Sequence, residues 1–179
     1  MNALSSIISG KKNEGTSQFV SINPANKDDI LGTFANASIE ECREACLQAK
    51  KGFEIWKKTP APIRAGIISN FGKLIEKNKE ALSQILTREM GKPIKEARGD
   101  VQEAIDTCYF FVSEGRRLYG QTVPSEMNNK ELFTYRRPVG VFACITAGNF
   151  PFAVPSWYFI PALVCGNTCV WKPSEDTPY

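Results

Sequence analysis

Apolar residues near the start of the chain occur in short runs rather than at helical spacing. Residues 1–16 are polar, and we expect them to be frayed at the start. Gln18–Ile22 and Ile30–Phe34 are two short apolar runs, and the stretch 23–29 between them is polar and contains a proline. Two such runs around a turn-forming stretch predict a β-hairpin with a wide turn.

From Ser38 onward the apolar positions recur every three or four residues, which predicts helices. Ser38 and Glu41 have the spacing of a capping box, Pro60 opens a second helix, Gly91 ends a third and Pro93 starts a fourth. The apolar faces comprise Ile39, Cys42, Ala45, Cys46, Ala49, Phe53 and Trp56 in the first helix; Ile63, Ile67, Phe71, Leu74 and Ile75 in the second; Ala81, Leu82, Ile85 and Leu86 in the third; and Ile94, Ala97, Val101, Ala104, Ile105, Cys108, Phe111 and Val112 in the fourth. Because these faces are continuous, we expect the helices to pack on something larger than one another.

After Gly120 the period changes to that of strands. Leu132–Arg137 alternates and predicts one strand of an antiparallel hairpin. Val141–Ile145 is continuously apolar, as in a strand buried on both faces; a helix over about 151–165 and a second buried strand at Cys169–Trp171 follow. Strand, helix and strand in this order predict a parallel βαβ unit of the α/β class. A doubly wound sheet needs more than two strands, so we expect the sheet to be incomplete in this chain.

Composition and charge narrow the function classes. The 179 residues are 42% hydrophobic and 23% charged, as in a globular protein, and the net charge of +3 is too small to indicate binding to nucleic acid or a membrane surface. The absence of histidine excludes Ser-His-Asp and Cys-His pairs and imidazole zinc sites, and we expect no metal. The longest apolar stretch, Phe150–Val164, contains prolines and is too short to span a bilayer, and no secretory signal is visible. We therefore expect a reduced, cytoplasmic protein.

The six cysteines show no Cys-x-x-Cys spacing of a redox or metal motif. They lie in a predicted buried strand, beside a turn with apolar neighbours, or on helix core faces: Cys144; Cys165 and Cys169; and Cys42, Cys46 and Cys108, respectively. A nucleophilic cysteine needs access and a lowered pKa. The sequence indicates neither, so we interpret all six as free core thiols.

The loop Thr146–Asn149 follows the carboxyl end of a predicted parallel strand and precedes a helix. Open α/β sheets bind ligands at such ends, and free N–H groups at the start of a helix attract anions. The carboxamide of Asn149 has the chemistry to donate a hydrogen bond to a developing oxyanion. The other interpretation is that Asn149 is an N-cap with Pro151 in the first turn. These residues alone leave both interpretations open.

The segment Lys172-Pro173-Ser174-Glu175 comes just after the second strand. An acidic residue there accepts hydrogen bonds from ribose hydroxyls, and a lysine donates to them. A solvated turn with its charges pointing outward is the alternative.

The combined spacing of several motifs resembles the aldehyde dehydrogenase superfamily over essentially the whole chain. The motifs are Asn23-Pro24-Ala25, Trp56, Arg64, Glu89-Met90-Gly91-Lys92-Pro93, Ile145-Thr146-Ala147-Gly148-Asn149-Phe150-Pro151, Trp157, Pro161-Ala162-Leu163, Gly166-Asn167-Thr168 and Lys172-Pro173-Ser174-Glu175-Asp176-Thr177-Pro178.

This resemblance implies oxidation of an aldehyde to a carboxylic acid with NAD or NADP. In the family a cysteine thiolate attacks the aldehyde to give a thiohemiacetal, hydride leaves to the nicotinamide, and water hydrolyses the thioester. Asn149 matches the asparagine that helps to stabilise the oxyanion, and Lys172 and Glu175 match the pair that contacts the adenosine ribose. The other matched positions are the cofactor-cleft residues Ile145, Thr146, Ala147, Gly148 and Ser174 and the substrate-tunnel residues Val154 and Trp157.

The chain departs from the family in two ways. The family most often has Pro-Trp before the asparagine, whereas this chain has Ala147-Gly148, and the glycine removes an aromatic ring near the cofactor and loosens the loop. The nucleophilic cysteine, the general-base glutamate and the glycine-containing phosphate loop lie downstream in the family and outside residues 1–179.

A carboxylate at Glu175 accepts from a ribose 2′-OH and repels a 2′-phosphate, so NAD is favoured, with NADP still allowed.

The resemblance implies an α/β, aldehyde dehydrogenase-like fold with a Rossmann-type sheet that is incomplete here. We expect residues 1–121 to be the hairpin and helices of the cofactor-binding domain, 122–138 part of an oligomerisation hairpin, and 139–179 the start of the dinucleotide-binding βαβ unit, with the catalytic domain absent. The prediction is the N-terminal part of an enzyme that oxidises a small-molecule aldehyde and forms a homo-oligomer (dimer or tetramer) when full length. The alternative is a truncated, inactive remnant that acts only as a binding or structural polypeptide.

Overall fold

The computed structural model describes residues 4–179. Within this range the helices are α1 (Ile39–Trp56), α2 (Ala61–Lys77), α3 (Lys79–Met90), α4 (Ile94–Glu114) and α5 (Ala153–Val164). The strands are β1 (Ser6–Ile8), β2 (Lys11–Asn13), β3 (Ser17–Ile22), β4 (Ile30–Asn36), β5 (Thr122–Val123), β6 (Leu132–Phe133), β7 (Val141–Ile145) and β8 (Thr168–Lys172). Among the described residues, no helix is both long and apolar enough to cross a membrane.

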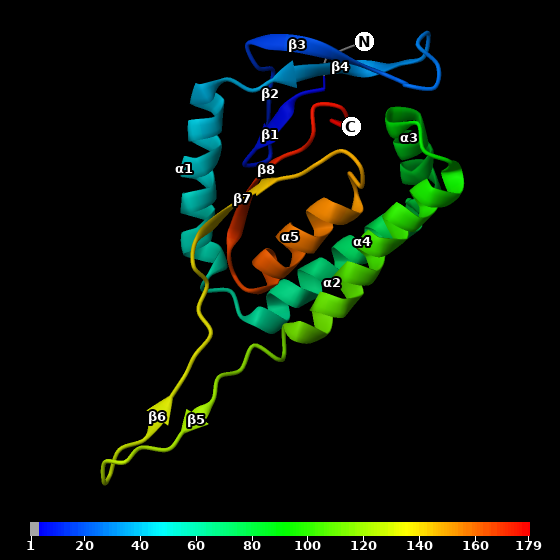
Figure 1. Ribbon diagram of the computed structural model, residues 1–179. Helices are drawn as coiled ribbons and strands as arrows, with labels where there is room; N and C mark the ends of the chain where they lie inside the picture. The colour runs from blue at the N-terminus through cyan, green and yellow to red at the C-terminus, as the bar shows by residue number, and fades with distance from the viewer. Residues whose placement is uncertain (1–3) are drawn as a thin grey trace.

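The strands β7 and β8 form the centre of a layered α/β arrangement (Figure 1). They run parallel, with Val141 opposite Thr168 and Ile145 opposite Lys172, and α5 makes the connection between them. Both α1 and α5 contact the two strands, and α2 and α4 pack against α5. The predicted parallel βαβ unit is therefore confirmed.

The hydrophobic core lies where α2, α4 and α5 meet. Val101, Ile105, Ile160 and Val164 are almost completely buried there. Burying each such side chain contributes about 1.5–3 kcal/mol, so this contact holds the helical layer together. As expected from the continuous apolar faces, α2 and α4 pack on α5 as well as on each other, whereas α3 packs on α2 and α4 and α1 packs on β7 and β8.

The helix ends that Ser38, Pro60, Gly91 and Pro93 predicted are confirmed. Glu41 N donates to Ser38 Oγ (3.1 Å) and Ser38 N donates to Glu41 Oε2 (2.8 Å), which completes the capping box of α1. The helices α2 and α4 begin directly after Pro60 and Pro93, and α3 ends at Gly91.

The expectation that residues 1–16 are frayed is wrong for the residues that the structure describes, and residues 1–3 lie outside them. β1 and β2 pair around a two-residue turn, with Ile8 opposite Lys11. Ser9 and Gly10 both have positive φ (52° and 77°), as a type I′ hairpin turn requires. The glycine at position 10 was the sequence signal for this hairpin.

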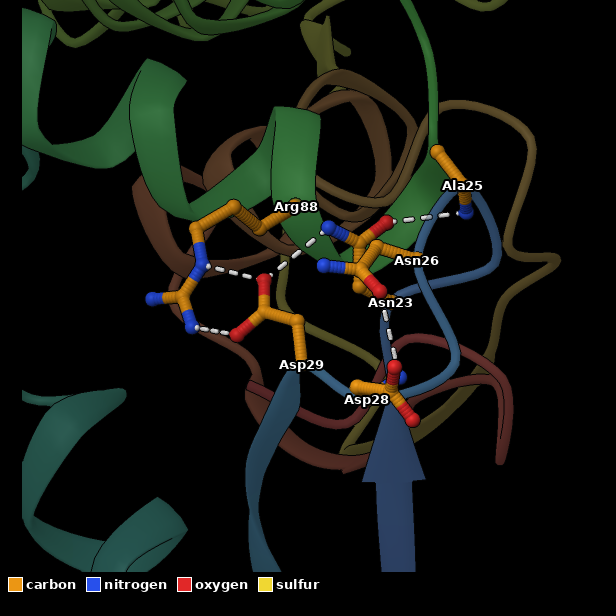
Figure 2. Close-up of polar contacts among 6 residues, drawn as sticks. All are labelled: Asn23, Ala25, Asn26, Asp28, Asp29 and Arg88. Carbon is orange, nitrogen blue, oxygen red and sulfur yellow. Dashed lines mark hydrogen bonds and ion pairs between the residues drawn. The ribbon is translucent and has the colours of Figure 1, made fainter.

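The predicted hairpin at β3 and β4 is confirmed, and its turn is tied to α3 (Figure 2). Arg88 Nε and Nη2 donate to the two carboxylate oxygens of Asp29 at 3.0 and 2.5 Å, and Asn23 Nδ2 donates to Asp29 Oδ2 at 3.0 Å. These hydrogen bonds lower the pKa of Asp29 to about 2. The asparagine of the Asn23-Pro24-Ala25 motif thus helps to dock the hairpin on the helical layer.

Three expectations about exposure and length are wrong. No residue of α1 is buried, and Cys42 and Cys46 are exposed, although α1 contacts β7 and β8. In β7 only Cys144 is buried, since β7 has β8 as its single strand neighbour in the described chain. The strand expected at 132–137 is only β6, in a hairpin that extends away from the body (Figure 1).

Candidate functional site

The carboxyl ends of β7 and β8 lie side by side, because Ile145 and Lys172 are paired in the parallel register. The segments that leave them, 146–152 and 173–179, therefore share one edge of the sheet. Thr146 N donates to Lys172 O (3.2 Å), and Trp171 Nε1 donates to Thr146 Oγ1 (3.0 Å). This edge is where an α/β sheet presents a ligand site.

Gly148 lies close against the second segment. A Cβ placed on Gly148 would lie 3.0 Å from Ser174 Oγ and 3.1 Å from Thr177 Oγ1. The lack of a side chain at Gly148 lets the two segments pack closely, and the expectation that this glycine loosens the loop stays a prediction. The Thr177 hydroxyl is buried here and has no hydrogen-bond partner among residues 4–179.

Asn149 is exposed beside this contact, as is Ala147. Within residues 4–179 the Asn149 carboxamide makes no hydrogen bond, and only its backbone oxygen is bonded, as an acceptor from Lys92 Nζ at 2.9 Å. The N-cap interpretation of Asn149 is wrong, because α5 begins at Ala153 and not at Pro151. Asp100 of α4 takes the role of the cap: its Oδ1 accepts from Ala153 N at 2.7 Å.

Lys92 and Asp100 form a buried ion pair directly behind the loop. Lys92 Nζ lies 2.9 Å from Asp100 Oδ2, and the side chains are 7% and 0% exposed. Lys92 Nζ also lies over the ring of Phe150, 4.4 Å from its centroid. Reasoning from the sequence missed this pair. Its one visible signal is the place of Asp100 on the apolar face that carries Ala97 and Ala104.

Glu89 holds the other segment from the same corner of the helical layer. It is buried near the end of α3, and its Oε1 accepts from Tyr179 N at 2.5 Å. Burial raises the pKa of Glu89 to about 7. One corner, between α3 and α4, therefore contacts both segments at the edge of the sheet.

Lys172 and Glu175 pair with each other in water. Lys172 Nζ lies 2.6 Å from Glu175 Oε2, and the side chains are 59% and 75% exposed. This hydrogen bond holds the pKa of Glu175 below its usual value. Ser174 Oγ accepts from Asp176 N at 3.3 Å and faces Gly148. A donor and an acceptor are thus available to a ligand next to the Gly148 contact.

The two positions expected along a substrate tunnel behave differently. Trp157 is about half exposed and lines an open groove of about 540 Å³ together with Phe142, Ile145 and Tyr158. Val154 is partly buried and does not line this groove. The structure therefore brings Trp157 and Ile145 together and leaves Val154 apart.

Trp56 and Arg64 fix the far end of α5. Trp56 Nε1 donates to Leu163 O (2.9 Å), and the buried Arg64 donates from Nε to Val164 O (2.9 Å). Desolvation lowers the pKa of Arg64. Leu163 O also accepts from Gly166 N at 3.0 Å, so the indole adds a second donor to a carbonyl in the last turn, and the two side chains tie this end of α5 to α1 and α2.

The described cysteines do not form a nucleophilic site at this edge. Burial raises the pKa of Cys108 to about 11 and that of Cys169 to about 12. Cys144 is buried, as expected, whereas Cys165 is exposed, at the opposite end of α5 from Asn149. The core-thiol interpretation therefore holds for Cys108 and Cys144 and is wrong for Cys42, Cys46 and Cys165.

Comparisons with known proteins agree with the fold described above. The 2,5-dioxopentanoate dehydrogenase of Saccharolobus solfataricus is 35% identical over 161 residues, which is 90% of this chain and 34% of the relative. An E. coli NADP-dependent enzyme matches with a TM-score of 0.95 and 34% identity over 98% of this chain and 37% of that one. Betaine aldehyde dehydrogenase of Staphylococcus aureus, solved with NAD+, matches with a TM-score of 0.94 and 28% identity over 99% of this chain and 37% of that one.

The chain thus spans about a third of the length of the curated relatives it matches. The pattern that describes the aldehyde dehydrogenase family matches residues 11–179, nearly the whole sequence. Together with the Rossmann-type βαβ unit, this match shows that the chain belongs to the aldehyde dehydrogenase family.

Proposed function

We propose that this chain is the N-terminal part of an enzyme that oxidises an aldehyde to a carboxylic acid with NAD or NADP. The observation that carries the proposal is the Asn149 carboxamide, exposed at the carboxyl end of β7 and without a hydrogen bond within residues 4–179. A donor placed there stabilises an aldehyde oxygen as negative charge develops on it, and it binds the neutral aldehyde more weakly.

The residues at the edge of β7 and β8 fit a dinucleotide. Lys172 and Glu175 offer a donor and an acceptor to ribose hydroxyls, and their own pairing is exposed to water. The unpartnered hydroxyl of Thr177 and the close approach at Gly148 give a polar, closely packed floor, with Ser174 beside it and the backbone of Ile145–Gly148 as one wall. When bound, the nicotinamide accepts the hydride; the part of this chain is to bind and orient the cofactor.

Glu175 favours NAD over NADP, because a carboxylate accepts from a 2′-OH and repels a 2′-phosphate. The similarity to an NADP-dependent enzyme of E. coli makes NADP the cofactor to compare against.

The thiolate of the family's reaction has no source among residues 4–179 at this edge. Cys108 and Cys169 have raised pKa values, and Cys165 lies at the other end of α5. We therefore propose that the nucleophilic cysteine lies outside residues 1–179. The reaction then proceeds through a thiohemiacetal and a thioester on that cysteine. The 179-residue chain by itself is expected to show no dehydrogenase activity.

An aldehyde that carries a carboxylate is the proposed substrate class. The Saccharolobus relative is named for 2,5-dioxopentanoate, which has an aldehyde and a carboxylate, and it is 35% identical to this chain. The Staphylococcus enzyme, named for the cationic betaine aldehyde, is 28% identical.

The hairpin β5–β6 is proposed to contribute to a homo-oligomer. It extends from the body (Figure 1), and its aromatic side chains Phe133 and Tyr135 are 54% and 70% exposed. Large apolar side chains on a projecting element commonly mark an interface.

The test is aldehyde-dependent formation of NADH or NADPH, followed at 340 nm. It uses the polypeptide encoded by the complete reading frame that contains this chain, beside the 179-residue chain alone. The panel holds aldehydes with a carboxylate, with a cation and without charge. Turnover by the complete polypeptide supports the proposal, whereas a folded complete polypeptide that is inactive with every aldehyde and both cofactors contradicts it. Activity of the 179-residue chain alone would overturn the statement that the nucleophile lies elsewhere.

A further inference from the structure

The buried pair Lys92–Asp100 makes contacts that its place in the fold does not require. Lys92 lies in the corner between α3 and α4, and Asp100 lies in the second turn of α4. Their side chains are 7% and 0% exposed, and the ion pair measures 2.9 Å. A buried ion pair is weak evidence for stability, because the cost of removing both charges from water offsets their attraction. The contacts of the pair therefore need another explanation.

The pair contacts the segment 146–152 at Asn149 and at the point where it enters α5. Lys92 Nζ donates to Asn149 O at 2.9 Å, and Asp100 Oδ1 accepts from Ala153 N at 2.7 Å. Lys92 Nζ also sits over the ring of Phe150, the residue that follows Asn149. Two side chains on one helical corner thus fix the loop where it leaves Asn149 and where it enters α5.

The two hydrogen bonds hold the backbone at Asn149 and Ala153, the third contact is to the Phe150 ring, and none of the three involves the Asn149 carboxamide. Bonds in a buried place compete little with water, so the geometry that they set is well defined. A hydrogen-bond donor acts on a developing oxyanion only when it is held at the right place in advance. The contacts that such a donor needs are those that Lys92 and Asp100 make.

We infer that Lys92 and Asp100 are positioning residues, which act through Asn149 by fixing the direction of its carboxamide. This inference rests on the proposed function of Asn149. It assigns no contact with the aldehyde or the cofactor to either residue.

The decisive variant is the double substitution Lys92→Met/Asp100→Asn. It removes both charges, so no unpaired charge is buried, and the Asn oxygen still accepts from Ala153 N. The bond to Asn149 O is lost. In the complete polypeptide we expect kcat to fall about 10- to 100-fold, as for a misplaced reacting group, with an unchanged KM for the cofactor. The thermal midpoint is expected to stay near that of the wild type.

Two further variants separate positioning from a purely structural role. In an Asn149→Ala background, Lys92→Met/Asp100→Asn is expected to lower kcat no further, because Lys92 acts through the missing carboxamide. Arg98 lies on α4, as Asp100 does, and Arg98→Met breaks its exposed ion pair with Glu80 of α3; this variant is the matched control and should leave kcat unchanged. Additive losses of kcat, or an unchanged kcat in the double variant, would overturn the inference.

A measurement on the 179-residue chain keeps the inference apart from the proposed function. The order parameter of the Asn149 backbone amide is expected to fall from about 0.85 to below about 0.6 in the Lys92→Met/Asp100→Asn variant. An inactive wild-type enzyme contradicts the proposed function. The order parameter still shows whether Lys92 and Asp100 hold the segment 146–152. Equal order parameters in wild type and variant overturn the positioning role.

Discussion

The two segments that leave β7 and β8 meet at one edge of the sheet, yet they are held in different ways. The segment 146–152 is tied to α4 and the corner before it by a buried ion pair with 7% and 0% exposure. The turn after β8 carries its ion pair, Lys172–Glu175, in water at 59% and 75% exposure. For the proposed reaction, the difference means that the donor for the developing charge is fixed, while the groups for the exchangeable cofactor can rearrange.

Breaking each ion pair in turn is the largest test of this difference. Lys92→Met leaves the Asp100 carboxylate buried without its partner and is expected to cost about 3–5 kcal/mol of unfolding free energy. Lys172→Met leaves Glu175 in water, and no change in the urea midpoint is expected. Urea unfolding of both variants in the 179-residue chain measures the contrast. Equal shifts in the two variants would show that the pairs are held alike.

Removing the donor tests what the fixed segment does. Asn149→Ala in the complete polypeptide is expected to lower kcat about 10²- to 10³-fold, as the loss of one oxyanion donor does elsewhere. The KM for the cofactor should not change, because Asn149 faces the aldehyde in the proposal. Asn70→Ala, on the exposed face of α2, is the control. A normal kcat in Asn149→Ala would falsify the role of this carboxamide.

The pH dependence of stability tests the buried contact between Glu89 of α3 and the end of the second segment at Tyr179. Burial raises the pKa of Glu89 from 4.5 to about 7, so the folded state favours the protonated form. The resulting stabilisation is complete below pH 4.5 and is lost as the pH rises through 7, by about 3 kcal/mol in total.

Glu89→Gln keeps an acceptor for Tyr179 N and has no charge to lose. Urea unfolding at pH 5 and pH 8 should show a larger loss of stability in the wild type than in this variant. Parallel curves for the two proteins would mean that Glu89 titrates normally.

The smallest expected effect concerns the exposed turn. Glu175→Ala removes the acceptor for a ribose 2′-OH and the charge that repels a 2′-phosphate. The NAD-to-NADP ratio of kcat/KM is expected to fall roughly tenfold, the size of one hydrogen bond to a charged group. Asp176→Ala removes the neighbouring charge and should leave the ratio in place. If Glu175→Ala and Asp176→Ala have the same NAD-to-NADP ratio of kcat/KM, Glu175 does not contact the ribose 2′ position.

Local signals in the sequence were sufficient for most elements. The Ser38–Glu41 box, Pro60, Pro93 and Gly91 act on their own neighbourhood, and the helices begin or end there. The βαβ unit followed from its change of period. The hairpin around Gly10 was the local signal that was overlooked.

Contacts across long sequence separations were not predictable in the same way. Asn149 is of a residue type that is common at N-caps, but Asp100, 53 residues away from Ala153, supplies the acceptor for the start of α5. The exposure of β7 and of α1 depends on which neighbours are present, and the apolar pattern alone does not contain that information. A charged residue on an apolar helix face, such as Asp100, is the sign by which similar pairs can be sought.

The caps at the far end of α5 have a consequence for the order of events during synthesis. The indole of Trp56 and the guanidinium of Arg64 find their carbonyl acceptors 107 and 100 residues later in the chain. A ribosome that adds roughly 5–20 residues per second needs about 5–20 s to cover this distance. Helices form in about a microsecond, so α1 and α2 are complete long before α5 leaves the tunnel. Trp56 Nε1 and Arg64 Nε stay hydrated during this interval, and the arrival of residues 163 and 164 sets the moment at which the first third of the chain can close.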